Sequence, residues 1–345
     1  MQLTVLLPGL IWPDPQLTDI YRNLPLPSLE WLLGHGNPLA HPDTLEHWLA
    51  HHTGLPAPLP VARLTAALDG VASDAALLRA DPVHLQVNME QLQLVPASAL
   101  AIDLSDAVAL QAALNRHFAA DGLCFHTPHP ERWYVTLPDA GQVNHTALEQ
   151  VIGHDIHPLL PHGPDSLRWH SRLNEIQMLF YNHPANESRE QRGLPNINSI
   201  WFWGDGPLTP CTGWPWHTTC SDNLLLRALT HHAKADIAPL PADAAQWLAR
   251  PRKGPVLLML DQLQTAAQYG DAYPWRNTLQ QLDQDWFGPI RRACQQRIIH
   301  HLTLVVPGQF ALDLPPAHRW KFWRRSLPLA KLAASAPLTH SPLTD

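Results

Sequence analysis

The chain opens with a continuous apolar run, Leu3–Leu7, and comparable runs return only near its other end, at Pro255–Leu260 and Leu302–Val306. Uninterrupted apolar segments of this length are typical of strands that are buried on both faces of a parallel sheet. A helical pattern separates the two later runs, which is the alternation of an open α/β sheet. The sequence therefore predicts an α/β domain whose strands come from both ends of the chain.

The middle of the chain has a different character. Val83–Val87 and Gln91–Val95 alternate apolar and polar residues, as antiparallel strands with one covered face do. Helices are predicted over residues 105–121 and 165–183 from their apolar spacing. Strands followed by helices on one face indicate an inserted α+β module.

These patterns predict the domain organisation. An α/β domain with an open, mostly parallel sheet is expected from residues 1–79 and 206–345. An inserted α+β domain is expected over residues 80–205. Inside the first domain, Ser28 is predicted to cap a short helix that Gly34 ends, and a single helix is predicted over residues 274–297.

The composition excludes several classes of protein. With 45% hydrophobic residues the chain is not a disordered tail, and its net charge of −7 argues against a protein that binds nucleic acid through phosphates. The sequence has no uninterrupted apolar stretch of about 18 residues, so no membrane span is predicted. The four cysteines form no C-x-x-C pair, which argues against a disulfide scaffold or a cysteine zinc site. We expect a cytoplasmic protein with reduced thiols and no cofactor.

Four collinear segments carry a family resemblance. They are residues 26–36, 81–88, 183–198 and 260–271, and the third, with His-Pro-Ala-Asn followed by Arg, Gly and Pro, is the most specific. Through them the chain resembles the archaeal-type cofactor-independent phosphoglycerate mutases of the alkaline phosphatase superfamily. The resemblance implies that residues 1–79 and 206–345 form a degenerate, alkaline-phosphatase-like α/β domain and that residues 80–205 form its inserted α+β lid domain. The stretch Asn174–Met178 adds a closer likeness to an uncharacterised proteobacterial group labelled regulatory protein RpfE.

The resemblance implies a mechanism and also a test of it. Such mutases hold two divalent metals with aspartates and histidines at strand ends, and the metals activate a serine that carries the phosphoryl group. In this chain Pro8 stands at the first aspartate, Gln264 at a second aspartate and Gln268 at a histidine. Neutral amides are weak ligands for such metals. Ser73 is the candidate relict nucleophile, with a helix cap as the alternative.

The insertion keeps more of its polar residues. The resemblance implies that its arginines contact the substrate, so Arg189, His183 and Asn186 are a candidate anion site, because a guanidinium binds a carboxylate or phosphate bidentately. Arg132 is a second candidate. The alternative is structural: His183 ends one helix, Asn186 caps the next turn and Arg189 pairs with a neighbouring glutamate.

Two further segments are chemically suggestive. His154, Asp155, His157 and His162 form the densest histidine cluster, either a metal site or a polar loop among prolines. Residues 318–325 form a basic-aromatic segment in an acidic protein, either a docking segment or an amphipathic terminal helix.

Taken together, these observations favour a catalytically degenerate relative of the mutases with a regulatory role, one that binds a small anion or a protein partner. The alternative is an enzyme, either a phosphotransferase with relocated metal ligands or one that catalyses a metal-free reaction.

Overall fold

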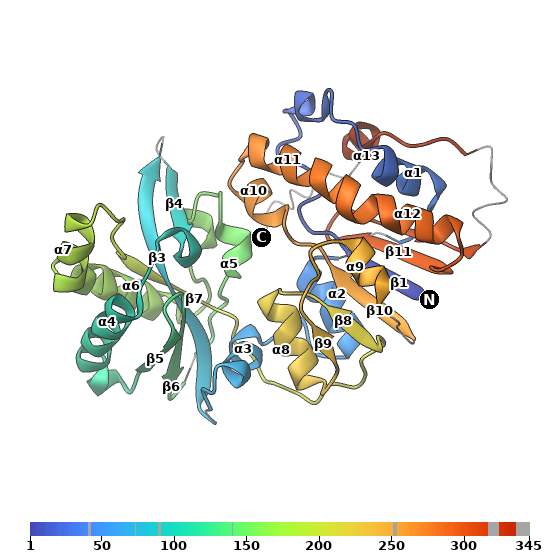
Figure 1. The fold of residues 1–345 in the computed structure, drawn as a ribbon. Helices are drawn as coiled ribbons and strands as arrows, with labels where there is room; N and C mark the ends of the chain where they lie inside the picture. The colour runs from blue at the N-terminus through green and yellow to red at the C-terminus, as the bar shows by residue number, and fades with distance from the viewer. Residues whose placement is uncertain are drawn as a thin grey trace. The chain divides into compact units, whose positions relative to one another are not determined.

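The computed structural model describes residues 1–40, 43–72, 74–88, 91–139, 141–250, 254–316 and 324–335. Two compact units make up the chain (Figure 1). The first contains Met1–Ala57 and Pro210–Asp345, and the second is Pro58–Thr209. The chain thus leaves the first unit once and returns to it.

The first unit is built on a seven-stranded sheet in the order β2-β12-β11-β1-β10-β8-β9. Its strands are β1 (Gln2–Leu6), β2 (Asn37–Pro38), β8 (Thr218–Cys220), β9 (Ile237–Ala238), β10 (Pro255–Met259), β11 (His301–Val306) and β12 (Phe310–Leu314). β1 pairs in parallel with both β10 and β11, and β10 and β9 pair in parallel with β8. Among the described strands of this sheet, β12 alone is reversed: it pairs antiparallel with β11 on one side and with the edge strand β2 on the other. The mostly parallel α/β sheet predicted from the apolar runs is therefore confirmed.

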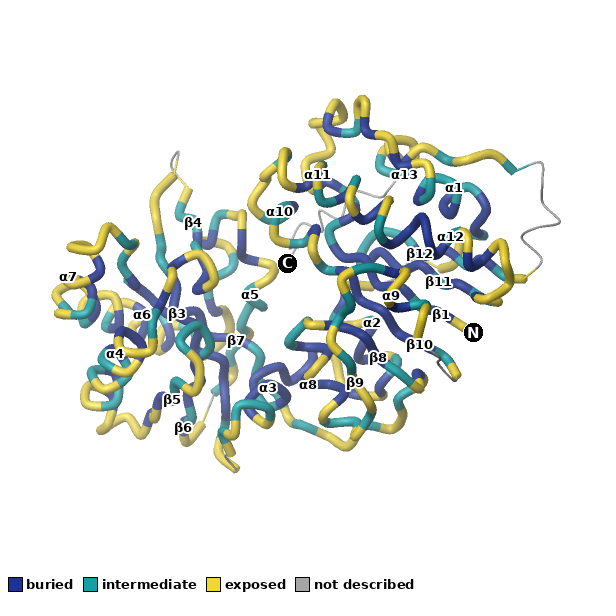
Figure 2. The backbone as a smooth tube through the Cα atoms, viewed as in Figure 1, coloured by how far each residue is buried: buried dark blue, intermediate teal, exposed yellow. Residues whose placement is uncertain are grey.

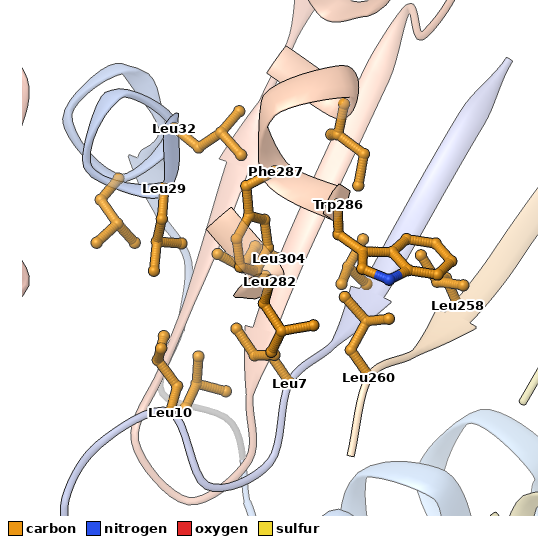
Figure 3. Close-up of a cluster of buried hydrophobic side chains, with 14 of the residues drawn as sticks. Leu7, Leu10, Leu29, Leu32, Leu258, Leu260, Leu282, Trp286, Phe287 and Leu304 are labelled. Atoms are coloured by element: carbon orange, nitrogen blue, oxygen red, sulfur yellow. The ribbon is translucent and has the colours of Figure 1, made fainter. Parts of the chain in front are cut away.

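Helices cover this sheet. They are α1 (Pro27–His35), α2 (Leu45–Thr53), α8 (Leu224–His232), α9 (Ala244–Ala249), α10 (Gln264–Gln268), α11 (Ala272–Leu282), α12 (Gly288–Gln295) and α13 (Leu329–Ser335), with η1 (Thr18–Tyr21) and the π-helical turn η5 (Asp283–Phe287). Because side chains alternate along a strand, Leu3 and Val5 point to one face of β1, and both join a core with residues of α1, α9, α11 and α12. Figure 3 shows part of that core, with Trp286 of η5 beside Leu258 of β10 and Phe287 of η5 between Trp286 and Leu29 of α1.

The helix predicted over residues 274–297 is interrupted. α11 ends at Leu282, η5 adds a π turn, and α12 begins at Gly288. The turn buries Asp283, whose carboxylate accepts hydrogen bonds from the backbone N–H groups of Ser28 (3.1 Å) and Leu29 (2.6 Å). The prediction that Ser28 caps α1 is wrong: the helix begins at Pro27, and Asp283 supplies the acceptor that a cap would supply.

The second unit is an α+β module around a five-stranded antiparallel sheet in the order β4-β3-β6-β5, with β7 paired to β3. Its strands are β3 (Ala76–Asn88), β4 (Gln91–Pro96), β5 (Cys124–His129), β6 (Arg132–Leu137) and β7 (Ser199–Trp203). Its helices are α3 (Val61–Leu68), α4 (Leu104–His117), α5 (Leu148–Val151), α6 (Ser166–Tyr181) and α7 (Pro184–Gln191), with the short 3-10 turns η2 (Ala97–Ala99), η3 (Ala119–Asp121) and η4 (His157–Leu159). α4, α6 and the sheet share a core around Trp133 and Trp169. α3 packs on β3, so in this structure residues 58–79 belong with the second unit.

Burial follows these two cores (Figure 2). The central strands of the first unit and the middle of β3 and β7 are buried, whereas the outer helix faces and loops are exposed. No helix among the described residues is both long enough and apolar enough to cross a membrane.

Candidate functional site

The carboxyl ends of parallel strands are where an open α/β sheet holds its ligands. β1 leads into Leu7, Pro8 and Gly9, and Pro8 is buried. The side chain of proline carries no donor or acceptor atom, so Pro8 provides no ligand for a metal. The carbonyl of Gly9 accepts a hydrogen bond from the indole of Trp275 at 2.8 Å. The segment after the central strand is therefore engaged in contacts within the protein.

Gln264 and Gln268, at two further ligand positions implied by the resemblance, lie on α10 and are half-buried. The backbone N–H of Gln264 donates to the carbonyl of Asp261 at 3.0 Å. An amide side chain brings no negative charge to balance a divalent cation. Within the described parts of the chain, no three His, Cys, Asp or Glu side chains gather as metal ligands. The implied ligand positions are thus occupied by neutral groups.

Three polar residues lie at the same edge, beyond β8 and β10. The amide of Asn223 donates to the Asp261 carboxylate at 3.0 Å, and its backbone N–H donates to the Ser221 hydroxyl at 3.0 Å. Asn223 also caps α8 by accepting from the N–H of Leu226 at 3.2 Å. Sequence reasoning missed this group, although a Ser-Asp-Asn run directly before a predicted helix was the signal available.

A glycine holds the end of β1 close to α10. Gly9 has φ of +78°, and a Cβ there would lie 2.8 Å from the Cα of Gln264. We expect Gly9→Ala to lower the free energy of unfolding by more than the roughly 1–2 kcal/mol of a left-handed backbone alone. Gly270→Ala is the matched control, because Gly270 has φ of +69° and nothing within 4 Å of that Cβ. Equal losses for both variants in urea titrations would contradict the close approach.

Arg189 is fully buried inside the second unit. Its guanidinium donates to the Asp106 carboxylate at 2.7 Å and to the carbonyl of Pro195 at 2.9 Å. The carbonyls of Leu100 and Ala101 accept further hydrogen bonds from it. This arrangement ties α7 to α4 and to the turn before α4. The guanidinium is therefore engaged by protein acceptors, and the partner is Asp106 rather than a neighbouring glutamate.

Asn186 and His183 also satisfy backbone groups. The Asn186 amide donates to the carbonyls of Phe180 and Ile197, both at 2.8 Å, and its oxygen accepts from the N–H of Ile197 at 2.9 Å. His183 is the N-cap of α7, and its ring accepts from the N–H of Ala185 at 3.2 Å. Together with Arg189, these residues fasten α7 and the segment after it.

Arg132 is the first residue of β6 and forms a bidentate ion pair with Asp69, with N–O distances of 2.5 and 2.6 Å. The hydroxyl of Tyr134 donates to the same carboxylate at 2.5 Å. Burial raises the pKa of Asp69, but the hydrogen bonds from Arg132 and Tyr134 outweigh burial and hold it below its ordinary value of 3.8. The pair fastens the end of α3 to the sheet, and it lies apart from the hydrogen bonds of Arg189.

The depressed pKa of Asp69 predicts acid sensitivity. A carboxyl whose folded pKa lies below the unfolded value contributes stability above about pH 3.8, and that stability is lost as the pH falls through the folded pKa. We expect Arg132→Gln to remove part of this contribution, so that the second unit unfolds at a higher pH than in the parent protein. Acid titrations followed by circular dichroism measure the midpoint. Arg168→Gln, on an exposed position of α6, is the control, and an equal midpoint for both variants would contradict the prediction.

Other candidate residues remain separate. Ser73 and residues 318–323 of the basic-aromatic segment lie outside the described residues. Arg324, which is described, donates to the carbonyls of His35 and Gly36 at 2.9 and 2.7 Å. In the histidine cluster, Asp155 accepts from backbone N–H groups, and His162 pairs with Asn144 through the backbone.

Comparisons with known proteins bear on the fold. The sequence matches no known family profile and no curated protein. The structure is similar to that of the protein PH0037 from Pyrococcus horikoshii, with 14% identity, 98% of this chain and 92% of that chain covered, and a TM-score of 0.50. It is also similar to the cofactor-independent phosphoglycerate mutase from Thermoplasma acidophilum DSM 1728, with 15% identity, 98% and 96% coverage, and a TM-score of 0.44. At these identities a likeness speaks to the fold alone.

Proposed function

We propose that the chain is a catalytically degenerate, phosphoglycerate-mutase-like protein with a binding or regulatory role in the cytoplasm. The resemblance in the segment 183–198 and in the three other collinear segments motivates the scaffold. The observation that supports the proposal is the edge of the parallel sheet, where a buried proline and two neutral amides stand at the positions for which the resemblance implies metal ligands. The closer likeness to the RpfE-labelled group is part of the same proposal.

The physical reason is charge. Two-metal phosphoryl transfer places dications against a negatively charged phosphoryl group, and ligand carboxylates hold those ions in position. Asp261, three residues before Gln264, accepts a hydrogen bond from Asn223, and among the described residues no three His, Cys, Asp or Glu side chains gather as metal ligands. One carboxylate and neutral amides do not balance two dications, so a site of this kind is expected to bind metal weakly.

Metal analysis with an activity assay tests the proposal. The protein is stripped with a chelator, incubated with Mn²⁺, dialysed, and analysed for bound metal and for mutase turnover with 3-phosphoglycerate. An active cofactor-independent mutase treated in parallel is the positive control. We expect less than stoichiometric metal and no turnover above the blank. Stoichiometric metal together with turnover would overturn the proposal.

One observation favours the enzymatic alternative, namely the linked group of Ser221, Asn223 and Asp261 at the strand ends. A hydroxyl and a carboxylate at this edge suit either a metal-free reaction or a relocated ligand set. Asp261→Asn distinguishes the two proposals, because it keeps the size of the side chain and removes its charge. Turnover that is present in the parent protein and abolished in this variant would support the enzyme.

A further inference from the structure

One face of the parallel sheet carries polar side chains over part of β1, β11 and β12, where such sheets are usually apolar. The register places Gln2 beside His301 and Thr4 beside Thr303, and Asp313 of β12 lies across from Thr303. The imidazole of His301 contacts the carboxylate of Asp313. These side chains share one face of β1, β11 and β12 because they alternate with the core-facing leucines. Polar side chains such as these can form hydrogen bonds with a polar group that lies on this face.

A cavity of about 670 Å³ lies over this face of the sheet, and its lining extends along β11 to Val305 and to Ala311 of β12. Gln2, Thr4, His301 and Thr303 belong to its lining. Another side is formed by α2, with Trp48, His51 and His52, and by Trp216 before β8. A volume between about 300 and 1,000 Å³ is typical of sites for small molecules. All of these residues belong to the first unit, and Gln2 and His301 lie at the opposite end of the strands from Asp261.

Three aromatic rings stack against one another on one side of this cavity and form its aromatic wall. The ring centroids of Trp48 and His52 are 4.0 Å apart, those of Trp48 and Trp216 are 5.5 Å apart, and those of His52 and Trp216 are 5.4 Å apart, with interplanar angles of 32°, 29° and 29°. The indole N–H of Trp216 donates to the hydroxyl of Thr4 at 3.3 Å and so joins this wall to the sheet. A wall of nearly parallel rings favours a flat ligand that continues the stack.

The wall is uncharged at neutral pH. Burial lowers the pKa of His52, an effect that its hydrogen bond to the Trp48 carbonyl partly offsets and that His51 reinforces. Nδ1 of His52 lies 2.8 Å from that carbonyl oxygen and therefore carries the proton, which leaves Nε2 as an acceptor. No lysine or arginine belongs to the lining within the described residues, and Asp43 lies at its margin. The cavity thus disfavours phosphates and other strong anions.

We propose that this cavity binds a neutral, planar nitrogen heterocycle of the nucleobase type. The ring stacks against the wall of Trp48, His52 and Trp216, and its polar edge bonds to the hydroxyls of Thr4 and Thr303. Base stacking on aromatic side chains is tolerant of base identity, whereas the edge contacts select the pattern of donors and acceptors. The inference is independent of the proposed loss of metal chemistry, because it concerns a different set of residues.

Calorimetric titration of the full-length protein with adenosine, guanosine, cytidine and uridine tests this inference. Glucose, maltose and 3-phosphoglycerate, titrated in the same way, are the negative controls. We expect at least one nucleoside to bind and the sugars and the phosphate to give no heat. Trp48→Ala is expected to weaken binding by about tenfold or more, because it removes one ring of the aromatic stack that lines the cavity. Thr303→Val keeps the shape of the side chain, removes its hydroxyl and is expected to weaken binding as well.

Trp31→Ala is the matched control. Trp31 stacks on His35 four residues later, with ring centroids 4.2 Å apart, and so repeats the Trp48 and His52 pair on α1 outside the cavity. It should leave the affinity unchanged. The inference is overturned if folded protein binds no nucleoside at millimolar concentration, if a sugar or 3-phosphoglycerate binds instead, or if Trp31→Ala weakens binding as much as Trp48→Ala.

Discussion

Arg189→Met is expected to lower the free energy of unfolding of the second unit by about 3–5 kcal/mol, because it removes one partner of a buried ion pair. The variant leaves the carbonyls of Pro195 and Leu100 without their donor and takes one cationic partner from Asp106. Methionine retains much of the volume, so the loss reports the hydrogen bonds more than a cavity. Urea titration with hydrogen exchange on peptides of residues 58–209 measures this unit separately.

Arg192→Met is the control for this prediction. Arg192 pairs with Asp103 and Asp106, but its side chain is 40% exposed. Exposed ion pairs contribute little because water screens them, so a far smaller loss is expected. If both variants lost the same amount, Arg189 would not be the fastening residue. If Arg189→Met kept full stability but lost affinity for glycerate phosphates, the anion site inferred from the sequence would be correct.

Trp275→Ala is expected to cost about 3–5 kcal/mol in the first unit, the range for removing a buried large aromatic side chain. Trp275 is fully buried, and its ring packs edge-on against Trp12 and Tyr21 at centroid distances of 5.5 and 5.8 Å. It also donates to the carbonyl of Gly9. The free energy from urea unfolding measures the loss, with exchange on β1 peptides identifying the unit.

Trp275→Phe separates packing from hydrogen bonding. It keeps an aromatic ring and leaves the Gly9 carbonyl unpaired, which costs about 1–3 kcal/mol for a buried group. Trp31→Ala provides the contrast at a half-buried site on α1. A loss for Trp275→Ala no larger than for Trp31→Ala would show that the end of β1 does not depend on this indole.

Local patterns predicted the strands well. The runs expected at Leu3–Leu7, Pro255–Leu260 and Leu302–Val306 correspond to β1, β10 and β11 within about a residue. Apolar continuity and strict alternation are properties of neighbouring residues, so they are readable without the fold. The π turn at Asp283 could not be predicted from local patterns, because the Asp283 carboxylate accepts hydrogen bonds from N–H groups 254 and 255 positions away in the sequence.

The candidate residues illustrate the same limit. The local alternatives considered for Arg189 were glutamates in its own helix, whereas its acid, Asp106, lies 83 residues earlier. The spacing of Trp48 and His52 is visible in the sequence, but Trp216 comes from a distant segment and completes the wall only in the folded unit. Motifs therefore identified candidate positions, and only tertiary contacts revealed what each polar group is paired with.

The central place of β1 constrains the order in which the protein folds during synthesis. β1 leaves the ribosome long before both of its neighbours, β10 and β11, which begin at Pro255 and His301. Residues 58–209 contain every strand of their own sheet and can close it earlier. Domains generally fold as units during translation. Residues 58–209 can therefore fold while the apolar strand β1 still lacks its partner strands. During that interval the nascent chain is most prone to misassociation, because an unpaired strand can pair with another chain.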